Sequence, residues 1–419
     1  MRPYSDKRVV LGVTGGIASY KSAWLARLLS KAGAEVDVVM TRAATEFVGA
    51  ITFEALTGRA VHTGLFDTGR ALDHIKLARD AHAIVIAPAT ADFMARAATG
   101  QADDLLSAVL LAAECPVLFV PAMNDHMWAH PQTRANVAHL RELGYRVLDP
   151  DEGALAAGEG HGPGRMPEPE FIFTHAGRLL ESATGLNGRR VLVTAGPTRE
   201  AIDPVRFISN HSSGKMGVAI AAAAWRRGAE VDLVAGPLNV ATPPGMTVHH
   251  VESTEQMATA VERLLPQADV LVMAAAPADF RAAAPAGSKI KKTDAPPALA
   301  LAPTPDILKS TKSARRDGSV IVGFALETND PLAGGKTKLT GKDLDMIVVN
   351  DATEAGAGFG VDTNRVTLLM RNGGEERLPL MPKTEVADAI LDRVESLMDP
   401  VLGSSDWRRG APNGGALGR

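Results

Sequence analysis

Residues 190–217 have the sequence RVLVTAGPTREAIDPVRFISNHSSGKMG, and this stretch decides the fold class. The apolar run Arg190–Val193 predicts a buried strand, and the alanine-rich residues 216–227 predict a helix. A connection between a strand and the helix that follows it usually takes only a few residues. The loop that begins at Thr194 is therefore oversized, and oversized loops at such a place are typically functional.

The composition of this loop predicts an anion site. The loop leads into a helix N-terminus, where free backbone N–H groups and the helix dipole attract negative charge. Arg199, Arg206 and Lys215 add positive charge around it. The stretch on its own therefore predicts a site for a phosphate or carboxylate ligand.

The composition of the whole chain excludes several classes of protein. At 419 residues the chain is too long for one average domain, so two domains are expected. A formal net charge of -4 argues against nucleic-acid binding driven by bulk charge. The single cysteine, Cys115, rules out a disulfide within the chain, no apolar run reaches membrane-spanning length, and the N-terminus lacks the layout of a signal peptide. We therefore expect a soluble, cytoplasmic protein that binds neither nucleic acid nor membrane.

Strand and helix patterns alternate through the first half of the chain, which predicts a parallel, doubly wound α/β sheet. The segment 153–169 is rich in glycine and proline and predicts a mobile flap rather than a packed element. The predicted strands are 9–13, 35–40, 84–87, 117–120 and 145–148, and the predicted helices are 20–32, 103–113, 132–143 and 170–180.

The second half restarts the same scheme at Asn187, so we expect a second doubly wound domain. Asn372-Gly373-Gly374 lies between two short apolar segments and predicts a β-hairpin. The predicted domains are 1–186 and 187–400, followed by a disordered tail at 401–419. The predicted strands are 190–193, 230–234, 270–274, 320–324 and 346–349, the hairpin strands are 365–370 and 377–380, and a closing helix is predicted at 384–397.

Small residues follow three strands of the first half. They are the turn VTGGIAS at 13–19, the turn APAT at 87–90 and the turn PAMN at 121–124. Because the carboxyl ends of parallel strands meet at one edge of an open sheet, these turns are expected to converge where such sheets bind ligands. The first turn alone fits either a phosphate site or a plain tight turn, since it lacks both the Walker A glycine pattern and the full dinucleotide fingerprint.

The motifs TGGIASYK, DHIKLARDAH, APATADF and PAMNDHMW, in this order, resemble the flavin-dependent cysteine decarboxylase family. The continuation into SNHSSGKMG and KIKK resembles the bifunctional phosphopantothenoylcysteine decarboxylase/phosphopantothenate–cysteine ligases of coenzyme A biosynthesis. The similarity runs from about Arg8 to Leu397. It implies two Rossmann-like domains: an N-terminal flavoprotein sheet and a C-terminal ligase sheet that carries the β-hairpin.

The resemblance implies an FMN site in the first domain. By position in the motifs, His74 is the active-site histidine and Asn124 holds the substrate carboxylate. From the residues alone, a loop histidine without a role is the favoured interpretation of His74, and Asn124 could be a turn former. The residues expected to contact FMN are Gly15, Gly16, Ser19, Thr41, Thr90 and Ser107.

The family reaction needs a proton donor on the flap, and the chain departs from the family at this point. FMN oxidises the cysteine thiol, decarboxylation follows, and the electrons return together with a proton. The family has a flap cysteine where this chain has Ala157, and the flap is one residue longer. Three hypotheses remain: Glu159 or His161 supplies the proton, the reaction stops at the oxidised enethiol, or the decarboxylase is inactive.

The resemblance also implies a CTP-dependent ligase in the second domain. An acyl-cytidylate and pyrophosphate form first, and the cysteine amine then attacks. Lys289 is expected to stabilise the developing charge, and Asn210 to hydrogen-bond the acyl-cytidylate. From the residues alone, the KIKK cluster could be a solvated charge run and Asn210 part of a polar turn.

Nucleotide contacts are implied on several further segments. Lys338 and Lys342 lie four residues apart on a predicted helix, so both side chains are on one face of it. The resemblance implies that they contact the triphosphate, and the alternative is a charged stripe on the surface. CTP brings Mg²⁺, which we expect the phosphates to hold without a protein metal site. The other expected nucleotide contacts are Ala275, Asp279, Pro305, Asp306, Ile307, Leu308 and Phe324.

The resemblance implies a homo-oligomer, in which trimers complete the flavin pocket and build a dodecamer while the ligase domains pair as dimers. Two other functions stay open. The chain could be a ligase alone, fused to an FMN-binding domain that decarboxylates poorly because of Ala157. It could also be a flavin-binding regulatory protein, against which the full ligase set argues.

Overall fold

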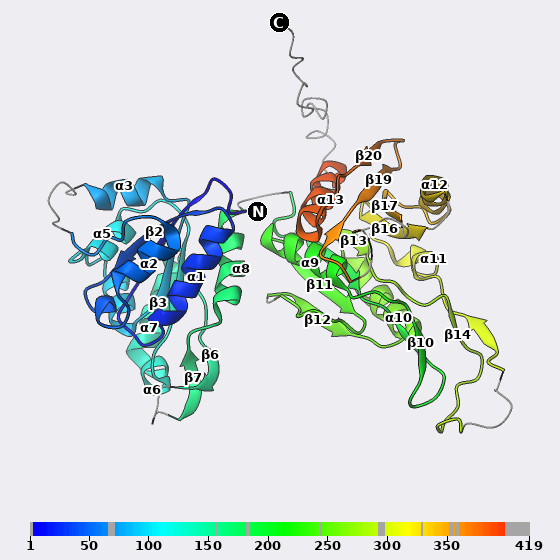
Figure 1. Cartoon of the computed structure of the whole chain (residues 1–419), viewed down its shortest axis with the longest axis horizontal. Helices are drawn as coiled ribbons and strands as arrows, with labels where there is room; N and C mark the ends of the chain where they lie inside the picture. The colour runs from blue at the N-terminus through cyan, green and yellow to red at the C-terminus, as the bar shows by residue number, and fades with distance from the viewer. Residues whose placement is uncertain are drawn as a thin grey trace, which may run out of the picture. The chain divides into compact units, whose positions relative to one another are not determined.

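The structure of the chain, a computed structural model, consists of two compact units, Met1–Ser182 and Ala183–Arg419 (Figure 1). It describes residues 3–65, 72–155, 158, 160–181, 185–243, 245–291, 298–327, 330–351, 356, 358 and 360–398. The predicted tail 401–419 and the flap residues Ala157 and Glu159 lie outside these residues. Among the helices described, none is long and apolar enough to cross a membrane.

The N-terminal unit contains a five-stranded parallel sheet with the strand order β2-β1-β3-β4-β5. This order reverses direction at β1, as in doubly wound folds, and confirms the predicted fold class. The strands are β1 (Arg8–Val13), β2 (Glu35–Met40), β3 (Ala83–Ala89), β4 (Val117–Pro121) and β5 (Arg146–Val147). The helices are α1 (Ser19–Lys31), η1 (Ala44–Glu46), α2 (Ala50–Thr57), α3 (Asp73–Asp80), α4 (Ala91–Ala98), α5 (Leu105–Leu111), α6 (Asp125–Ala129), α7 (Pro131–Glu142) and α8 (Pro169–Leu180).

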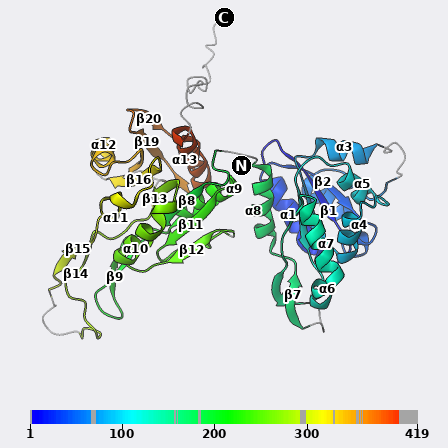
Figure 2. The same ribbon diagram turned by 180° about the vertical axis from the view of Figure 1, so that it is seen from behind.

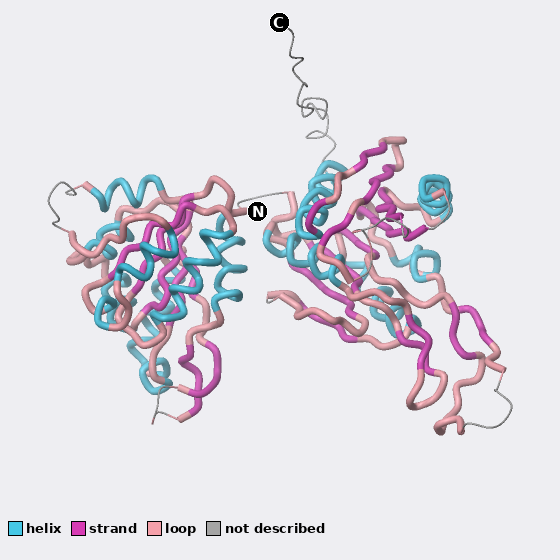
Figure 3. The backbone as a smooth tube through the Cα atoms, in the orientation of Figure 1, coloured by secondary structure: helices cyan, strands magenta, loops and turns pink. Residues whose placement is uncertain are grey.

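Both faces of this sheet are buried, because the side chains of each strand alternate between two cores. On β1, Val9 and Leu11 pack in one core with Leu25 of α1, whereas Val10 packs in the other with Phe93 of α4. Figure 3 shows the strands of the five-stranded sheet lying between helices. The nearly continuous apolar runs that predicted these strands therefore reflect burial on both sides.

Burial of one histidine makes the stability of the N-terminal unit depend on pH. Burial lowers the pKa of His175 on α8 from 6.5 to about 4, and Arg178 and Arg146 act in the same direction. Between these two values the unfolded chain binds a proton that the folded chain does not, so stability falls as the pH is lowered from 6.5 to about 4.

We expect His175→Gln to remove about 1–2 kcal/mol of this acid-induced loss of stability, a figure reduced to allow for partial exposure of the ring. Calorimetric unfolding of the wild-type and variant chains at several pH values between 4 and 7 measures the difference. Identical pH profiles for the two proteins would contradict the assignment to His175.

The segment 153–169 forms part of a hairpin, so the prediction of a flap without packed elements is wrong. Strands β6 (Asp151–Ala154) and β7 (His161–Arg165) pair as an antiparallel ribbon. Pro163 pairs with Glu152 at the irregularity in this ribbon, a place where an absent N–H is tolerated. The glycine and proline content indicated a loop. In the structure, these residues are part of a two-stranded ribbon that contacts the turn after β4.

The C-terminal unit contains an eight-stranded sheet with the order β12-β11-β8-β13-β16-β17-β19-β20, parallel from β12 to β17. The predicted hairpin is confirmed, but its second strand spans 375–377 rather than 377–380. The strands are β8 (Arg190–Ala195), β11 (Glu230–Ala235), β12 (Thr247–His250), β13 (Val270–Met273), β16 (Val320–Glu327), β17 (Met346–Asp351), β19 (Val366–Met370) and β20 (Glu375–Arg377). The helices are α9 (Lys215–Arg226), α10 (Thr254–Leu264), η2 (Leu265–Gln267), α11 (Ile307–Ser310), η3 (Lys312–Ala314), α12 (Pro331–Gly341) and α13 (Lys383–Met398).

Three two-stranded ribbons lie outside the large sheet, and the sequence predicted none of them. The oversized loop after β8 contains β9 (Arg199–Ala201) paired with β10 (Phe207–Ser209). Strands β14 (Phe280–Ala282) and β15 (Leu301–Pro303) pair at one end of the unit, next to β9 (Figure 2). The third ribbon joins β18 (Thr363–Asn364) to β21 (Met381–Pro382).

Candidate active sites

A glycine turn joins β1 to α1 at the carboxyl edge of the first sheet. Gly15 has no room for a side chain, because a Cβ there would collide with Ala43. A Cβ on Gly16 would instead meet only the methyl group of Thr90, at 3.8 Å. The buried Ser19 hydroxyl donates to the Gly16 carbonyl (2.6 Å) and so holds the turn in shape. The turn therefore leaves the Gly16 backbone open on the side where an anion would meet the start of α1.

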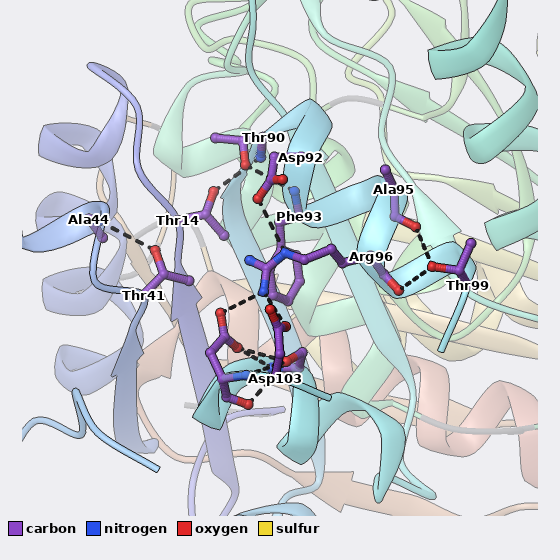
Figure 4. Close-up of polar contacts among 12 residues, drawn as sticks. Thr14, Thr41, Ala44, Thr90, Asp92, Phe93, Ala95, Arg96, Thr99 and Asp103 are labelled. Atoms are coloured by element: carbon purple, nitrogen blue, oxygen red, sulfur yellow. Dashed lines mark hydrogen bonds and ion pairs between the residues drawn. The ribbon is translucent and has the colours of Figure 1, made fainter. Parts of the chain in front are cut away.

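Threonine side chains connect this turn to the neighbouring strand end (Figure 4). The Thr14 hydroxyl donates to the Pro88 carbonyl (2.7 Å) and accepts a hydrogen bond from the Thr90 backbone N–H (3.0 Å). Thr41, after β2, accepts a hydrogen bond from the Ala44 N–H (3.3 Å). The structure therefore gathers Gly15, Gly16, Ser19, Thr41 and Thr90 at one edge of the sheet.

Ser107, the remaining expected FMN contact, uses its hydroxyl group to cap the N-terminus of α5. Its buried hydroxyl donates to the Asp104 carboxylate (2.8 Å) and accepts from the Asp104 N–H (3.1 Å), as a capping box. Arg96 of α4 binds both Asp104 (2.9 Å) and Asp103 (2.7 Å), as Figure 4 shows for Asp103. Burial opposes the charge of Arg96, but these carboxylates outweigh it and raise its pKa. The sequence did not predict this link between α4 and α5.

His74 lies in the first turn of α3, and its Nδ1 atom is buried without a hydrogen-bond partner among the residues that the structure describes. The preceding Asp73 lies 3.4 Å from the Nδ1 atom of His62. The backbone of His62 is hydrogen-bonded to Val38 and Met40 of β2, both at 2.9 Å. The start of α3 is thus attached to the edge of the sheet through His62, a residue that no sequence pattern predicted.

Asn124 caps α6, where its Oδ1 atom accepts a hydrogen bond from the His126 N–H (2.9 Å). The hairpin β6–β7 rests on this turn, because the Met123 N–H donates to the Gly164 carbonyl (3.0 Å). A Cβ on Gly164 would collide with the Met123 carbonyl oxygen. At the base of the hairpin, buried Lys21 of α1 donates to the Met166 carbonyl (2.8 Å). The flap therefore has a fixed base beside Asn124.

We expect Gly164→Ala to displace the hairpin from the Asn124 turn, since the colliding atom belongs to the backbone and cannot rotate away. The cost is about 1–3 kcal/mol of stability, with a matching loss of decarboxylation. Thermal unfolding and product analysis measure both effects. Gly287→Ala is the matched control, because a Cβ there meets nothing within 4 Å. Equal behaviour of the two variants would contradict the role of Gly164.

Of the three flap residues named from the sequence, His161 is the one that the structure describes. His161 is the first residue of β7, is exposed and pairs in register with Ala154. Ala157 and Glu159 lie outside the described residues. The structure therefore leaves the choice of proton donor as a prediction.

The C-terminal unit has a main cavity of about 460 Å³ at the carboxyl ends of β13 and β16 and the start of α9. Its volume is within the range of about 300–1,000 Å³ usual for ligand sites. Lys289 is not among the lining residues. Ten residues expected from the sequence line it together: Asn210, Ala275, Asp279, Pro305, Asp306, Ile307, Leu308, Phe324, Lys338 and Lys342.

Hydrogen bonds fix the two sides of this cavity. The Asn210 side-chain amide donates to the carbonyls of Ala276 (3.1 Å) and Pro277 (3.0 Å), which follow β13. On the opposite side, Lys342 lies 3.2 Å from the Asp306 carboxylate, which also caps α11. Asn210 is therefore held by the strand end that carries the expected nucleotide contacts.

Two further lysines line the main cavity: Lys215, which the sequence placed near the predicted anion site, and Lys383, which it did not predict. Lys215, at the start of α9, binds the Asp362 carboxylate and the Gly360 carbonyl, both at 2.7 Å. Buried Lys383 donates to the Gly358 carbonyl (2.9 Å), and burial, with Lys215 nearby, lowers its pKa. Together they fasten the loop before β18 to the cavity wall. No local pattern could have found Lys383, because it reaches the site from a distant part of the chain.

Lys289 lies exposed on the loop after β14. The next residue, Ile290, is held by the β9–β10 ribbon: its N–H donates to Asp203 (3.1 Å), and its carbonyl accepts from Arg206 (2.9 Å). Arg206 also binds Asp203 and lowers the pKa of that carboxyl. The structure thus attaches the loop of Lys289 to the ribbon and does not bring this lysine into the cavity.

Comparison with known proteins agrees with the division of the chain into two units. The Flavoprotein family matches residues 1–179, and the family described as DNA/pantothenate metabolism flavoprotein C-terminal domain matches residues 186–398. The chain is 48% identical over 407 residues to the coenzyme A biosynthesis bifunctional protein CoaBC of Mycobacterium tuberculosis (strain ATCC 25618 / H37Rv), covering 94% of this chain and 97% of that protein. It is 42% identical over 398 residues to the CoaBC protein of Bacillus subtilis (strain 168), covering 94% and 98%. A crystal structure of the C-terminal domain of a CoaBC protein is 39% identical and covers 52% of this chain and 100% of that one, with a TM-score of 0.45.

Proposed function

The chain belongs to the family of bifunctional coenzyme A biosynthesis proteins, and we propose that it makes 4′-phosphopantetheine in two steps. The C-terminal unit joins 4′-phosphopantothenate to cysteine with CTP through an acyl-cytidylate, and the N-terminal unit decarboxylates the product. It is an enzyme with a ligase half and a flavoprotein-type decarboxylase half. The observation that carries the proposal is the single cavity that gathers ten expected residues of the ligase half.

The chemistry of the main cavity supports acyl-nucleotide formation. A carboxylate becomes reactive toward an amine when a phosphoryl group is transferred to it, and the pyrophosphate that leaves carries strong negative charge. Lys338 and Lys342 line the cavity and supply positive charge, as does the start of α9. Among the described residues, no group of three or more His, Cys, Asp and Glu residues could hold a metal ion. We propose that Mg²⁺ enters with CTP and is held by its phosphates.

The residues of the N-terminal unit fit FMN. When bound, FMN supplies the exchange of an electron pair with the substrate sulfur that permits loss of carbon dioxide. The open backbone at Gly16 beside Thr90 suits its phosphate, and the unpartnered Nδ1 atom of His74 is available to hold a proton at the reacting group. Asn124 orients the substrate carboxylate from the turn after β4.

A second candidate function rests on Ala157. An alanine donates no proton, so the second candidate is a ligase joined to an FMN-binding half that does not complete its reduction. Both candidates share the ligase reaction and differ only in the final product.

One experiment separates these functions. Purified enzyme with FMN, Mg²⁺, CTP, 4′-phosphopantothenate and cysteine is analysed for pyrophosphate and, by mass spectrometry, for product. Pyrophosphate with phosphopantothenoylcysteine supports the ligase, and phosphopantetheine supports the full reaction. Absence of CTP-dependent pyrophosphate release would overturn the proposal.

Exposed apolar side chains support self-association of both units. In the N-terminal unit one group of them lies around α1 and α2, and in the C-terminal unit another group lies on the β9–β10 and β14–β15 ribbons. We propose trimers that build a dodecamer, with paired ligase units, in the cytoplasm. Light scattering after size exclusion tests this, and a monomer at working concentration would exclude it. The residues of these two groups are Ile17, Tyr20, Trp24, Phe47, Ile51, Val205, Phe207, Phe280 and Leu301.

A further inference from the structure

Arg315 lies in the connection between η3 and β16 and is not among the residues that line the main cavity. Its guanidinium group donates to the backbone carbonyls of Leu308 (2.8 Å), Lys342 (3.0 Å) and Asp343 (2.7 Å). Leu308 and Lys342 both line the cavity and are expected nucleotide contacts. One side chain outside the cavity therefore holds the main chain of two residues that line it.

The three carbonyls lie at the ends of two helices. Leu308 belongs to the short helix α11, and Lys342 and Asp343 directly follow α12. The last carbonyls of an α-helix have no partner within the helix, and a positive charge beside them is favourable. A planar guanidinium has five donors and can serve several such carbonyls at once. Arg315 thus joins the ends of α11 and α12, which Figure 1 shows next to each other.

The turn after α12 needs this support, because its backbone is strained. Asp343 has a φ of 55°, in the left-handed region that residues other than glycine seldom adopt. Its carbonyl accepts from Arg315, and its carboxylate pairs with Lys312 (3.0 Å) and Arg371 (2.8 Å). Lys312 and Arg371 hold the pKa of that carboxyl below its usual value. The end of α12 is therefore fixed by contacts from neighbouring segments.

Arg315 is itself a costly residue at this position. Burial lowers the pKa of its guanidinium, and its Nε atom is buried without a partner among the residues that the structure describes. A charge that is partly removed from water must be compensated by hydrogen bonds. The three carbonyls supply this compensation only while the ends of α11 and α12 stay in place.

A second link between the two helices lies at the cavity itself. The Lys342 ammonium contacts the carboxylate of Asp306 (3.2 Å), the residue that caps α11. A triphosphate would attract the same ammonium group, so a bound nucleotide competes with this link. The link through Arg315 uses backbone carbonyls instead, so it persists when a nucleotide binds.

We propose that Arg315 is a positioning residue for the nucleotide. It fixes the spacing of α11 and α12, so that Leu308 on one helix and Lys342 at the end of the other reach the same ligand. This inference rests on the proposed ligase function. Because the acyl-cytidylate forms before cysteine attacks, Arg315 acts on the binding of CTP and not on the binding of cysteine.

Arg315→Met tests this role, because it removes all three hydrogen bonds and keeps an unbranched aliphatic side chain. We expect the KM for CTP to rise about 10- to 30-fold, since two nucleotide contacts lose their common support. The kcat at saturating CTP and the KM for cysteine change less than about twofold, as for a loss of uniform binding. Pyrophosphate release at varied CTP and at varied cysteine measures these constants. Calorimetric titration with CTP and Mg²⁺ measures the affinity without turnover.

Arg371→Met is the matched control. Arg371 also binds Asp343 and donates to the Leu344 carbonyl (3.0 Å), so its loss weakens the same turn from the side of β19. We expect a comparable fall in melting temperature but a KM for CTP like that of the wild type. This comparison separates a general loss of stability from the positioning of the two nucleotide contacts.

Arg315→Lys keeps the charge without the planar fork of donors, and we expect a smaller rise in the KM for CTP. If Arg315→Met does not fold, the lysine variant decides. An unchanged KM for CTP in the folded variant, or an equal rise in Arg371→Met, would overturn the role of Arg315. If the wild-type enzyme released no pyrophosphate from CTP, the proposed function itself would fail instead.

Discussion

Asn210→Asp lowers kcat/KM of the ligation by about 10²–10³-fold, the expected cost of losing one positioned donor next to developing charge. The side-chain amide of Asn210 donates to the carbonyls of Ala276 and Pro277, which hold it at the wall of the main cavity. A carboxylate has no hydrogen to donate, so the aspartate is repelled by both carbonyl oxygens. Its negative charge also opposes the entry of a triphosphate. Steady-state release of pyrophosphate measures the loss.

The control for this change is Asn136→Asp at a partly exposed position of α7, which alters the same chemical group in the other unit. Both variants should keep the melting temperature of the wild type within a few degrees. An Asn210→Asp enzyme with normal turnover would contradict the assignment. A loss of activity that follows a loss of folded protein would reassign Asn210 to a structural role.

Local sequence patterns predicted the central strands of both large sheets because those strands are buried on two faces, whereas they missed the edge strand β12, which has no buried residue. Strand β1 divides its apolar side chains between two cores, and β8 has a similar run of buried residues. Such burial leaves a continuous apolar run in the sequence, bounded by glycine turns. Their order along the chain, with helices between them, was therefore enough to predict the doubly wound fold.

The small ribbons escaped prediction because their stability comes from partners rather than from their own sequence. Hairpin β6–β7 is rich in glycine and is held by Met123 and Lys21, which lie far from it along the chain. Ribbon β9–β10 is short, and one turn of it is fastened by Asp203 to the loop of Ile290. Neither arrangement leaves a periodic pattern, which is the signal that strand prediction uses.

The sequence was enough to predict that the expected ligase residues at strand ends lie together, because the carboxyl ends of parallel strands lie at the same edge of the sheet. Phe324 and Ala275 are such cases. Lys289 is not, since it follows β14, which belongs to a ribbon outside the sheet. The charge-stabilising role of Lys289 therefore stays a prediction. The position of its loop does not support this role within one chain, because Lys289 does not line the main cavity.

Ala157→Cys raises the yield of fully reduced 4′-phosphopantetheine by about 10²-fold or more, the usual contribution of a positioned acid. The hairpin that carries the flap already has a fixed base, because Gly164 and Lys21 hold β7 in place. A thiol at residue 157 therefore restores the donor without rebuilding its support. Single-turnover mixing, followed by the flavin absorbance and by product mass, measures the gain.

Ala154→Cys supplies the matched control, since it places a thiol on an exposed position of β6, three residues before residue 157 in the sequence. If wild type completes the reaction and Ala157→Cys adds nothing, impaired reduction is wrong, and His161→Ala then tests the remaining described donor. Loss of the final step in His161→Ala would assign the proton to that imidazole. Retention would leave Glu159, whose replacement by glutamine removes the acid while keeping the size of the side chain.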